Sequence, residues 1–186
     1  MKRLWILVGL LGILLLATLQ SGFWPQNSLK SQDGPASMRI SSSAFGNDQA
    51  VPVRFTCNGK NVNPALIVSG VPERATSLVL IVDDPDAPFG VFTHWLLWNI
   101  PPETKNIEEG EMPEGAVSGL NSNGRPGYNG PCPASGLHRY FFTVIALDSF
   151  VGLNGQASRS ELENAMRGHM VGEAHFYGRY NARSTE

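Results

Sequence analysis

Three stretches of strand length are apolar almost without interruption, and they constrain the fold more than any other feature of the chain. They cover residues 77–82, 94–100 and 139–147, and the last stretch is rich in aromatic and β-branched residues, which favour strands. Because both faces of these stretches are apolar, we expect interior strands of packed sheets. Asn-Gly and Pro-Pro pairs punctuate the chain around them, as is typical of turns. The chain is therefore predicted to be mainly β.

One helix is marked near the C-terminal end of the chain. Ser158 and Glu161 have the spacing of a capping box, and apolar residues then recur at helical intervals up to Met170. This pattern predicts a helix over residues 159–170. An extended pattern resumes over residues 174–180, so we expect a final strand after the helix.

The N-terminal segment has the composition of an export signal. Lys2 and Arg3 precede an apolar run over residues 4–19, which is the order found in secretory signal peptides. No Ala-x-Ala cleavage site follows the run, so residues 1–20 are predicted to be either a cleaved signal peptide or a retained membrane anchor. Both interpretations place the rest of the chain in the periplasm or outside the cell, and a cytosolic product is the remaining alternative.

The rest of the chain is predicted to be a linker followed by one domain. Residues 21–37 are polar and rich in Pro, Gly and Ser, which predicts a flexible linker. Residues 38–186 have a common size for a domain with one core. The chain carries 14 Lys and Arg residues against 16 Asp and Glu residues, without a basic cluster. This balance argues against nucleic acid as a ligand, and it would not steer the domain onto anionic membranes.

Cys57 and Cys132 are the two cysteines of the chain, and both lie in turn-like sequences. In an exported protein, such a single pair is predicted to form a disulfide. The bond would fix the loop around residues 130–133 to the turn at 57–60. The alternative is a pair of separate buried thiols.

Two polar segments follow or precede predicted strands and carry the residues of a small pocket. The first covers residues 83–88 (Asp-Asp-Pro-Asp-Ala-Pro) and is followed by His94. The second begins with the Gly/Pro loop at 127–133 and leads into His138 and Tyr140. On a strand, these last two side chains share a face. Glycines in the loop allow close approach to backbone amides, and adjacent amides of this kind bind anions.

Carboxylates beside imidazoles suggest a site that uses both charges. Two nearby carboxylates would favour protonated histidines, and imidazolium groups with amide donors could hold an oxyanion. We expect Asp84 and Asp86 to orient His94 or His138, or to contact an ammonium group of the ligand. The expected ligand is therefore a small phosphate-like anion or a zwitterion.

In their order and spacing, these motifs resemble those of the phosphatidylethanolamine-binding protein family, in its prokaryotic Raf-kinase-inhibitor-like branch. The resemblance spans residues 38–180 and includes an early Phe-Thr-Cys-Asn-Gly-Lys stretch at 55–60 and a late Gly-Arg-Tyr at 178–180. It implies two packed antiparallel sheets with a few peripheral helices, and a pocket for phosphate-like anions and phospholipid head groups. Carried onto matching positions, the implied ligand-binding residues are Asp84, Asp86, Pro88, Phe92, His94, Gly130, Pro131, His138 and Tyr140.

The expected function is that of an exported, non-catalytic ligand-binding protein without a cofactor, and no protein partner is identified. An inhibitor of a protease or kinase is the first alternative. A metal-dependent hydrolase is the second, because Asp and His are common metal ligands, although the sequence lacks a His-Glu-x-x-His motif. It also lacks the Gly-x-Ser-x-Gly motif of serine hydrolases. A domain whose pocket merely accepts buffer anions is the plainest alternative.

Overall fold

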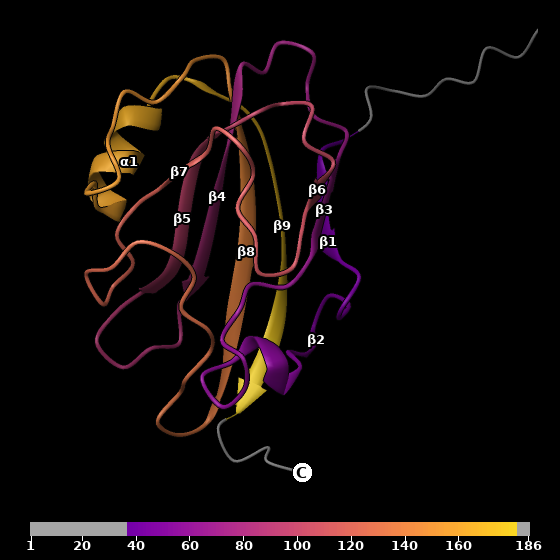
Figure 1. Cartoon of the computed structure of the whole chain (residues 1–186), viewed down its shortest axis with the longest axis vertical. Coiled ribbons are helices and arrows are strands. Elements are labelled where there is room, and N and C mark those ends of the chain that lie inside the picture. Colours follow the sequence, from indigo (N-terminus) through magenta and orange to yellow (C-terminus); the bar gives the residue numbers. More distant parts are fainter. Residues whose placement is uncertain (1–36, 182–186) are drawn as a thin grey trace, which may run out of the picture. The chain divides into compact units, whose positions relative to one another are not determined.

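The computed structural model describes residues 37–181, which contain two β-sheets and one α-helix (Figure 1). The larger sheet has six strands in the order β2 (Gln49–Ala50), β9 (Met170–Asn181), β8 (Leu137–Leu147), β4 (Ser77–Asp84), β5 (Phe92–Ile100) and β7 (Val117–Ser118). The smaller sheet has three strands in the order β1 (Arg39–Ser42), β3 (Leu66–Ser69) and β6 (Asn106–Ile107). The predicted mainly β fold with two packed sheets is therefore confirmed. The strand pairs are antiparallel except that β2 runs parallel to β9.

The three apolar stretches of the sequence form β4, β5 and β8, in the middle of the larger sheet. Alternate residues of each strand enter one of two cores, because successive side chains of a strand point to opposite faces. On β4, Leu80 and Val82 enter the first core, whereas Val79 and Ile81 enter the second. Both faces are therefore covered, which explains the continuous apolar pattern.

The first core lies between the two sheets, and the second lies between the larger sheet and the helix. Ile40, Val68 and Ile107 of the smaller sheet pack in the first core. In the second, Leu162 and Met166 of the helix pack with side chains of β4 and β5. Figure 1 shows the helix and the smaller sheet on opposite sides of the larger sheet.

The helix, α1, covers Arg159–Met166 and is shorter than predicted. The capping box is present: the Ser158 side chain accepts a hydrogen bond from the backbone N–H of Glu161, whose carboxylate accepts one from the N–H of Ser158. The expected end at Met170 is wrong. Gly168 has a φ of 81°, a left-handed conformation that glycine readily adopts and that interrupts a helix. Met170 then begins β9, where it pairs with Leu147.

The described residues lie almost wholly within the domain predicted over residues 38–186. The predicted signal peptide or anchor at 1–20 lies outside the described residues, and so does the predicted linker at 21–37 except for its last residue. Within residues 37–181, no helix combines the length and the apolar character that a membrane span requires.

Candidate ligand-binding pocket

The strand pairing brings the two polar segments of the sequence to the same end of the larger sheet. β4 ends at Asp84 and pairs with β5 on one side and with β8 on the other. Both pairings are antiparallel, so the start of β5 and the start of β8 lie beside the end of β4. Asp83 accordingly faces Thr93 on one side and Phe141 on the other.

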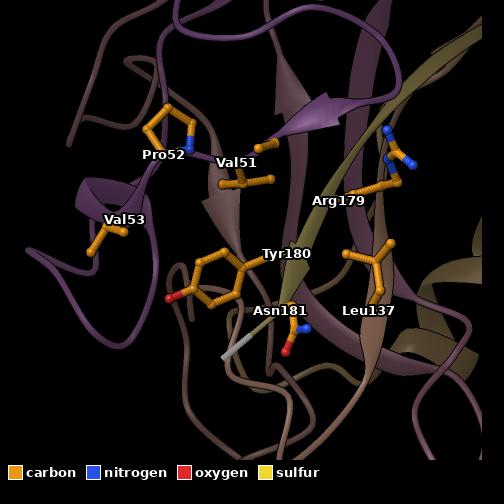
Figure 2. Close-up of a pocket in the computed structure, with 8 residues that line it drawn as sticks. Val51, Pro52, Val53, Leu137, Arg179, Tyr180 and Asn181 are labelled. Atoms are coloured by element: carbon orange, nitrogen blue, oxygen red, sulfur yellow. The ribbon is translucent and has the colours of Figure 1, made fainter. Parts of the chain in front are cut away.

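A cavity of about 190 Å³ lies at this end of the sheet. Its lining comes from the end of β4 and the loop after it, the start of β5, the loop before β8 and the first residues of β8: Asp84, Ala87, Pro88, Phe92, His94, Asn129, Cys132, Pro133, Ala134 and His138. We call this cavity the histidine pocket. A larger cavity of about 470 Å³ lies beside β2 and the end of β9. Figure 2 shows Val51, Tyr180 and Leu137 around it, and its lining lacks a carboxylate or a histidine.

The histidine pocket contains part of the predicted ligand-binding set: Asp84, Pro88, Phe92, His94 and His138. Asp86, Gly130, Pro131 and Tyr140 do not line it. Sequence reasoning missed Asn129, Ala87, Pro133 and Ala134 as lining residues. The signal was present, because each of them adjoins a residue of the two motifs.

His138 is held through both of its ring nitrogens. Its Nδ1 lies 2.7 Å from Oδ2 of Asp84, and its Nε2 lies 3.2 Å from the carbonyl oxygen of Ser135. Both partners are acceptors, whereas a neutral imidazole carries a single N–H. An acceptor oxygen therefore lies within reach of whichever ring nitrogen carries the proton. The other oxygen of the Asp84 carboxylate accepts the backbone N–H of Asp86 at 2.8 Å.

His94 is buried and differs from the expectation that the carboxylates would keep it protonated. Burial lowers the pKa of His94 below its ordinary value of 6.5, and this effect outweighs the hydrogen bond to Asn129 and the charge of Asp84. Its Nδ1–H donates to the carbonyl oxygen of Asn129, 2.5 Å away. That bond occupies one nitrogen, so the neutral ring has Nε2 as an acceptor. The ring packs against Phe92, with 4.8 Å between the ring centroids.

Tyr140 lies near both histidine rings and is fully buried. Its ring centroid is 5.2 Å from that of His94 and 6.5 Å from that of His138. Among the buried side-chain polar atoms of residues 37–181, the Tyr140 hydroxyl alone lacks a partner at hydrogen-bond geometry. Burial, and after it the negative charge of Asp84, raises the pKa of Tyr140. The hydroxyl thus lies near the Asp84 carboxylate, which also raises its pKa by attracting its proton.

Asp86 does not serve the histidines as predicted. Its carboxylate forms a two-pronged ion pair with Arg139, with Nε at 2.9 Å from Oδ2 and the second nitrogen at 2.7 Å from Oδ1. The Arg139 side chain holds the pKa of Asp86 at about 2. Because Arg139 points to the opposite face of β8 from His138, it draws the carboxylate away from the pocket. The Arg139 side chain is itself exposed.

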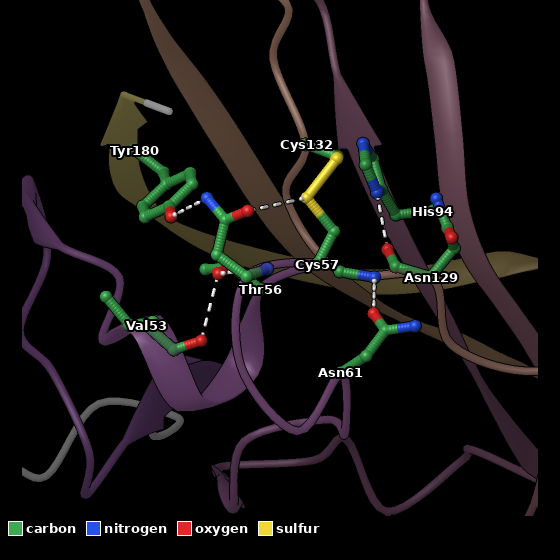
Figure 3. Close-up of a disulfide and its surroundings, with 10 residues drawn as sticks. Val53, Thr56, Cys57, Asn61, His94, Asn129, Cys132 and Tyr180 are labelled. Carbon is green, nitrogen blue, oxygen red and sulfur yellow. Dashed lines mark hydrogen bonds between the residues drawn. A yellow bond between two sulfur atoms is a disulfide. The ribbon is translucent and has the colours of Figure 1, made fainter. Parts of the chain in front are cut away.

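The loop before β8 is fixed by a disulfide and by hydrogen bonds (Figure 3). Cys57 and Cys132 form the predicted disulfide, and Cys57 N–H also donates to the carbonyl oxygen of Pro131. The expectation of free amides in this loop is wrong at Gly130, whose N–H donates to Oδ1 of Asn61 at 2.7 Å. Asn129 pairs through its backbone with His94. The wall of the pocket is thus attached to a distant turn.

The described residues do not contain three or more His, Cys, Asp or Glu side chains arranged to hold a metal ion. Asp84 contacts His138, but His94 is held by a backbone carbonyl instead of a carboxylate. The pocket is therefore best described by its two imidazoles and one carboxylate.

Comparison with known proteins identifies the family. The model of the phosphatidylethanolamine-binding protein family matches residues 41–181. The chain belongs to this family. The resemblance inferred from the motifs is therefore confirmed, and the histidine pocket contains Asp84, His94 and His138 of those family motifs.

The protein has relatives in archaea and in bacteria. A "UPF0098 protein" of Methanothermobacter thermautotrophicus is 47% identical over 148 aligned residues, and the match covers 77% of this chain and 98% of the relative. A crystal structure of a putative phosphatidylethanolamine-binding protein homolog from Chlamydia trachomatis is 38% identical with a TM-score of 0.76, covering 78% of this chain and 98% of that one. The structure of Escherichia coli YbcL, described as a member of the mammalian family, is 28% identical with a TM-score of 0.74 and covers 78% and 99%.

Proposed function

We propose that the protein is a non-catalytic ligand-binding protein whose histidine pocket holds a small phosphate-like anion or a phospholipid head group. The observation that carries this proposal is the pair of imidazoles in one cavity of about 190 Å³, each oriented by a second group. The His94 ring is suited to a tetrahedral oxyanion, because its Nδ1 is held by the Asn129 carbonyl and its Nε2 can donate once the ring is protonated.

The size of the pocket supports a small ligand. Pockets for drug-sized molecules have volumes of about 300–1,000 Å³, and the histidine pocket, at about 190 Å³, is smaller. A phosphate group with a short substituent fits this volume, because a water molecule in the liquid occupies about 30 Å³. The pocket therefore favours a head group over a whole lipid.

The charges of the pocket support a ligand that carries both signs. A protonated imidazole can donate to a phosphate, whereas the Asp84 carboxylate can accept a hydrogen bond from an ammonium group. The lining lacks Ser, Thr and Lys, and its cysteine is bound in the disulfide. Binding without covalent catalysis is the simplest use of such a lining.

The proposal includes export of the domain to the periplasm or the extracellular space. A disulfide persists in oxidising compartments and is rare in the cytosol, so the Cys57–Cys132 bond supports this location. The apolar run at residues 4–19 supports it from the sequence.

Calorimetric titration with O-phosphoethanolamine and with inorganic phosphate tests the proposal. We expect His94→Gln and His138→Gln to weaken binding about tenfold or more, since each removes an oriented hydrogen-bonding group. His169→Gln is the matched control, because that histidine is exposed and pairs with Asp148 away from the pocket. Binding that is absent in the unmodified protein, or equally strong in all variants, would overturn the proposal.

A further inference from the structure

The histidine pocket has a polar floor and an apolar rim. Asp84 and His94 are buried and form its floor with the partly buried His138, whereas Ala87 and Pro88 contribute from the loop between β4 and β5 and Phe92 from the start of β5. Pro133 and Ala134 contribute from the loop before β8. A ligand in this pocket would meet charged and hydrogen-bonding groups inside and apolar carbon at the opening.

The loop between β4 and β5 also presents apolar side chains to solvent beside the rim. Residues 87–92 read Ala-Pro-Phe-Gly-Val-Phe, without a charged or strongly polar side chain. Within this loop, Phe89 is 101% exposed and Val91 is 59% exposed. Gly90 has a φ of 104°, and a Cβ placed on it would meet nothing within 4 Å. The loop therefore projects from the domain with a bare aromatic ring at its tip.

This exposure needs a partner that a free anion does not supply. Single exposed apolar residues are common, but here they adjoin residues that line the cavity containing His94 and His138. A free phosphate ion has no apolar part to cover Phe89 or Val91. A phospholipid in a bilayer does have an apolar part, because its acyl chains lie directly beneath the phosphate layer. Exposed aromatic side chains partition favourably into this boundary region.

The charge near the rim indicates which kind of bilayer would fit. Asp86 and Arg139 neutralise one another, and His138 pairs with Asp84. The loop at 87–92 carries no basic side chain. Attraction to anionic lipids is therefore not the basis of docking, which instead depends on apolar insertion and on the head group itself.

We propose that this end of the domain docks on a bilayer of zwitterionic phospholipid, with Phe89 and Val91 inserted among the lipids and a head group in the histidine pocket. The inference rests on the proposed function and specifies the source of the ligand. Insertion of the loop would seat the polar floor at the level of the phosphates, so that the pocket binds a head group within the membrane.

The first test uses the full chain with bicelles of phosphatidylcholine and phosphatidylethanolamine that contain a nitroxide-labelled acyl chain. We expect the nuclear magnetic resonance signals of residues 87–92 and 133–134 to broaden. Phe150 is the internal control, because it is 68% exposed and follows the far end of β8, away from the pocket. Broadening around Phe150 but not around Phe89 would overturn the proposal. This comparison holds even if the N-terminal segment attaches the chain to the bicelle, because it reports which end of the domain faces the lipid.

The second test measures the same lipid-induced broadening, together with binding of soluble O-phosphoethanolamine, in two variants. In the Phe89→Ser/Val91→Ser variant, the broadening at residues 133–134 is expected to be lost and binding of O-phosphoethanolamine to be unchanged, since neither residue lines the pocket. Phe150→Ser is expected to change neither. Soluble binding with unaltered broadening at residues 133–134 in the double variant would overturn docking and leave the proposed function standing. Loss of soluble binding in the unmodified protein would instead overturn the proposed function.

Sedimentation of the unmodified protein separates the bilayer from a second copy of the chain as the partner of the loop. We expect a monomer whose mass is unaffected by Phe89→Ser. Self-association that depends on Phe89 would overturn the proposal.

Discussion

At the scale of the residue, the charge of each side chain in the pocket depends on what lies around it. His94 and His138 line the same cavity, yet their surroundings differ. His138 faces two acceptor oxygens, Asp84 Oδ2 and Ser135 O, whereas burial lowers the pKa of His94. The site therefore combines an imidazole held between acceptor oxygens with a buried imidazole whose charged form an anionic ligand would favour.

This difference predicts that anion binding is coupled to protonation of His94. An anion beside the ring favours the charged form and raises its pKa in the complex. In the free protein, the pKa of His94 lies below 6.5. Anion binding at neutral pH is therefore accompanied by uptake of a proton, and it becomes tighter as the pH falls. The increase in affinity levels off once the pH is below the pKa of His94 in the free protein.

Titration with sulfate between about pH 8 and pH 5 measures this coupling, because sulfate does not titrate in that range whereas phosphate esters have a pKa near 6. His94→Gln should show a flatter pH profile than the unmodified protein. An affinity for sulfate that rises with pH would contradict the coupling.

At the scale of the element, two loops supply the pocket and the sheet holds them in place. The loop at 127–133 carries Asn129, Gly130 and Cys132, and each is bonded to a different part of the domain. At the tip of the loop between β4 and β5, the Gly90 N–H donates to the carbonyl oxygen of Ala87 within the same loop. One loop is thus a fixed wall, whereas the other is available for contact with a partner.

The fixed wall depends on the absence of a side chain at Gly130. A Cβ there would lie 2.4 Å from the carbonyl oxygen of Phe55 and 2.7 Å from Oδ1 of Asn61. Gly130→Ala is expected to lower the free energy of unfolding by about 1–3 kcal/mol and to weaken binding of O-phosphoethanolamine. Urea unfolding and calorimetry measure the two effects.

Gly152→Ala is the matched control, because a Cβ at Gly152 would meet nothing within 4 Å and its backbone is not left-handed. We expect its stability and its ligand affinity to match those of the unmodified protein. Equal behaviour of the two alanine variants would show that the close approach at Gly130 is not required.

At the scale of the whole molecule, two cores and one covalent bond hold the pocket at the end of the larger sheet. The cores fix β4, β5 and β8 relative to one another. The disulfide joins residues 75 positions apart and attaches the pocket wall to the turn after the short 3-10 helix at Val53–Phe55. The smaller sheet and α1 do not contribute to the lining of the pocket.

The disulfide is expected to contribute strongly to stability. Closing a loop of 75 residues restricts the unfolded chain by about 4 kcal/mol in the chain-entropy model. Cys57→Ser/Cys132→Ser should therefore show a lower urea midpoint, and its pocket should bind O-phosphoethanolamine more weakly because Cys132 lines it. A reducing agent should lower the midpoint of the unmodified protein to that of the variant and leave the variant unchanged.

Much of this protein could be predicted from local patterns. The apolar runs at 77–82 and 139–147 became β4 and β8, and Ser158 formed its capping box, because strand alternation and helix capping depend on neighbours in the chain. The motif order indicated the family, and the export context indicated the disulfide.

The tertiary structure decided the features that depend on distant neighbours. The local sequence could not predict the burial that lowers the pKa of His94 or the hydrogen bond made by the Gly130 amide. It also could not predict that Asp86 pairs with Arg139 on the other face of β8. It also missed the end of α1, because pairing of Met170 with Leu147 overrides helical spacing. Sequence thus determined which groups are present, and folding determined their charge and direction, because both depend on solvent access and on contacts across the sheet.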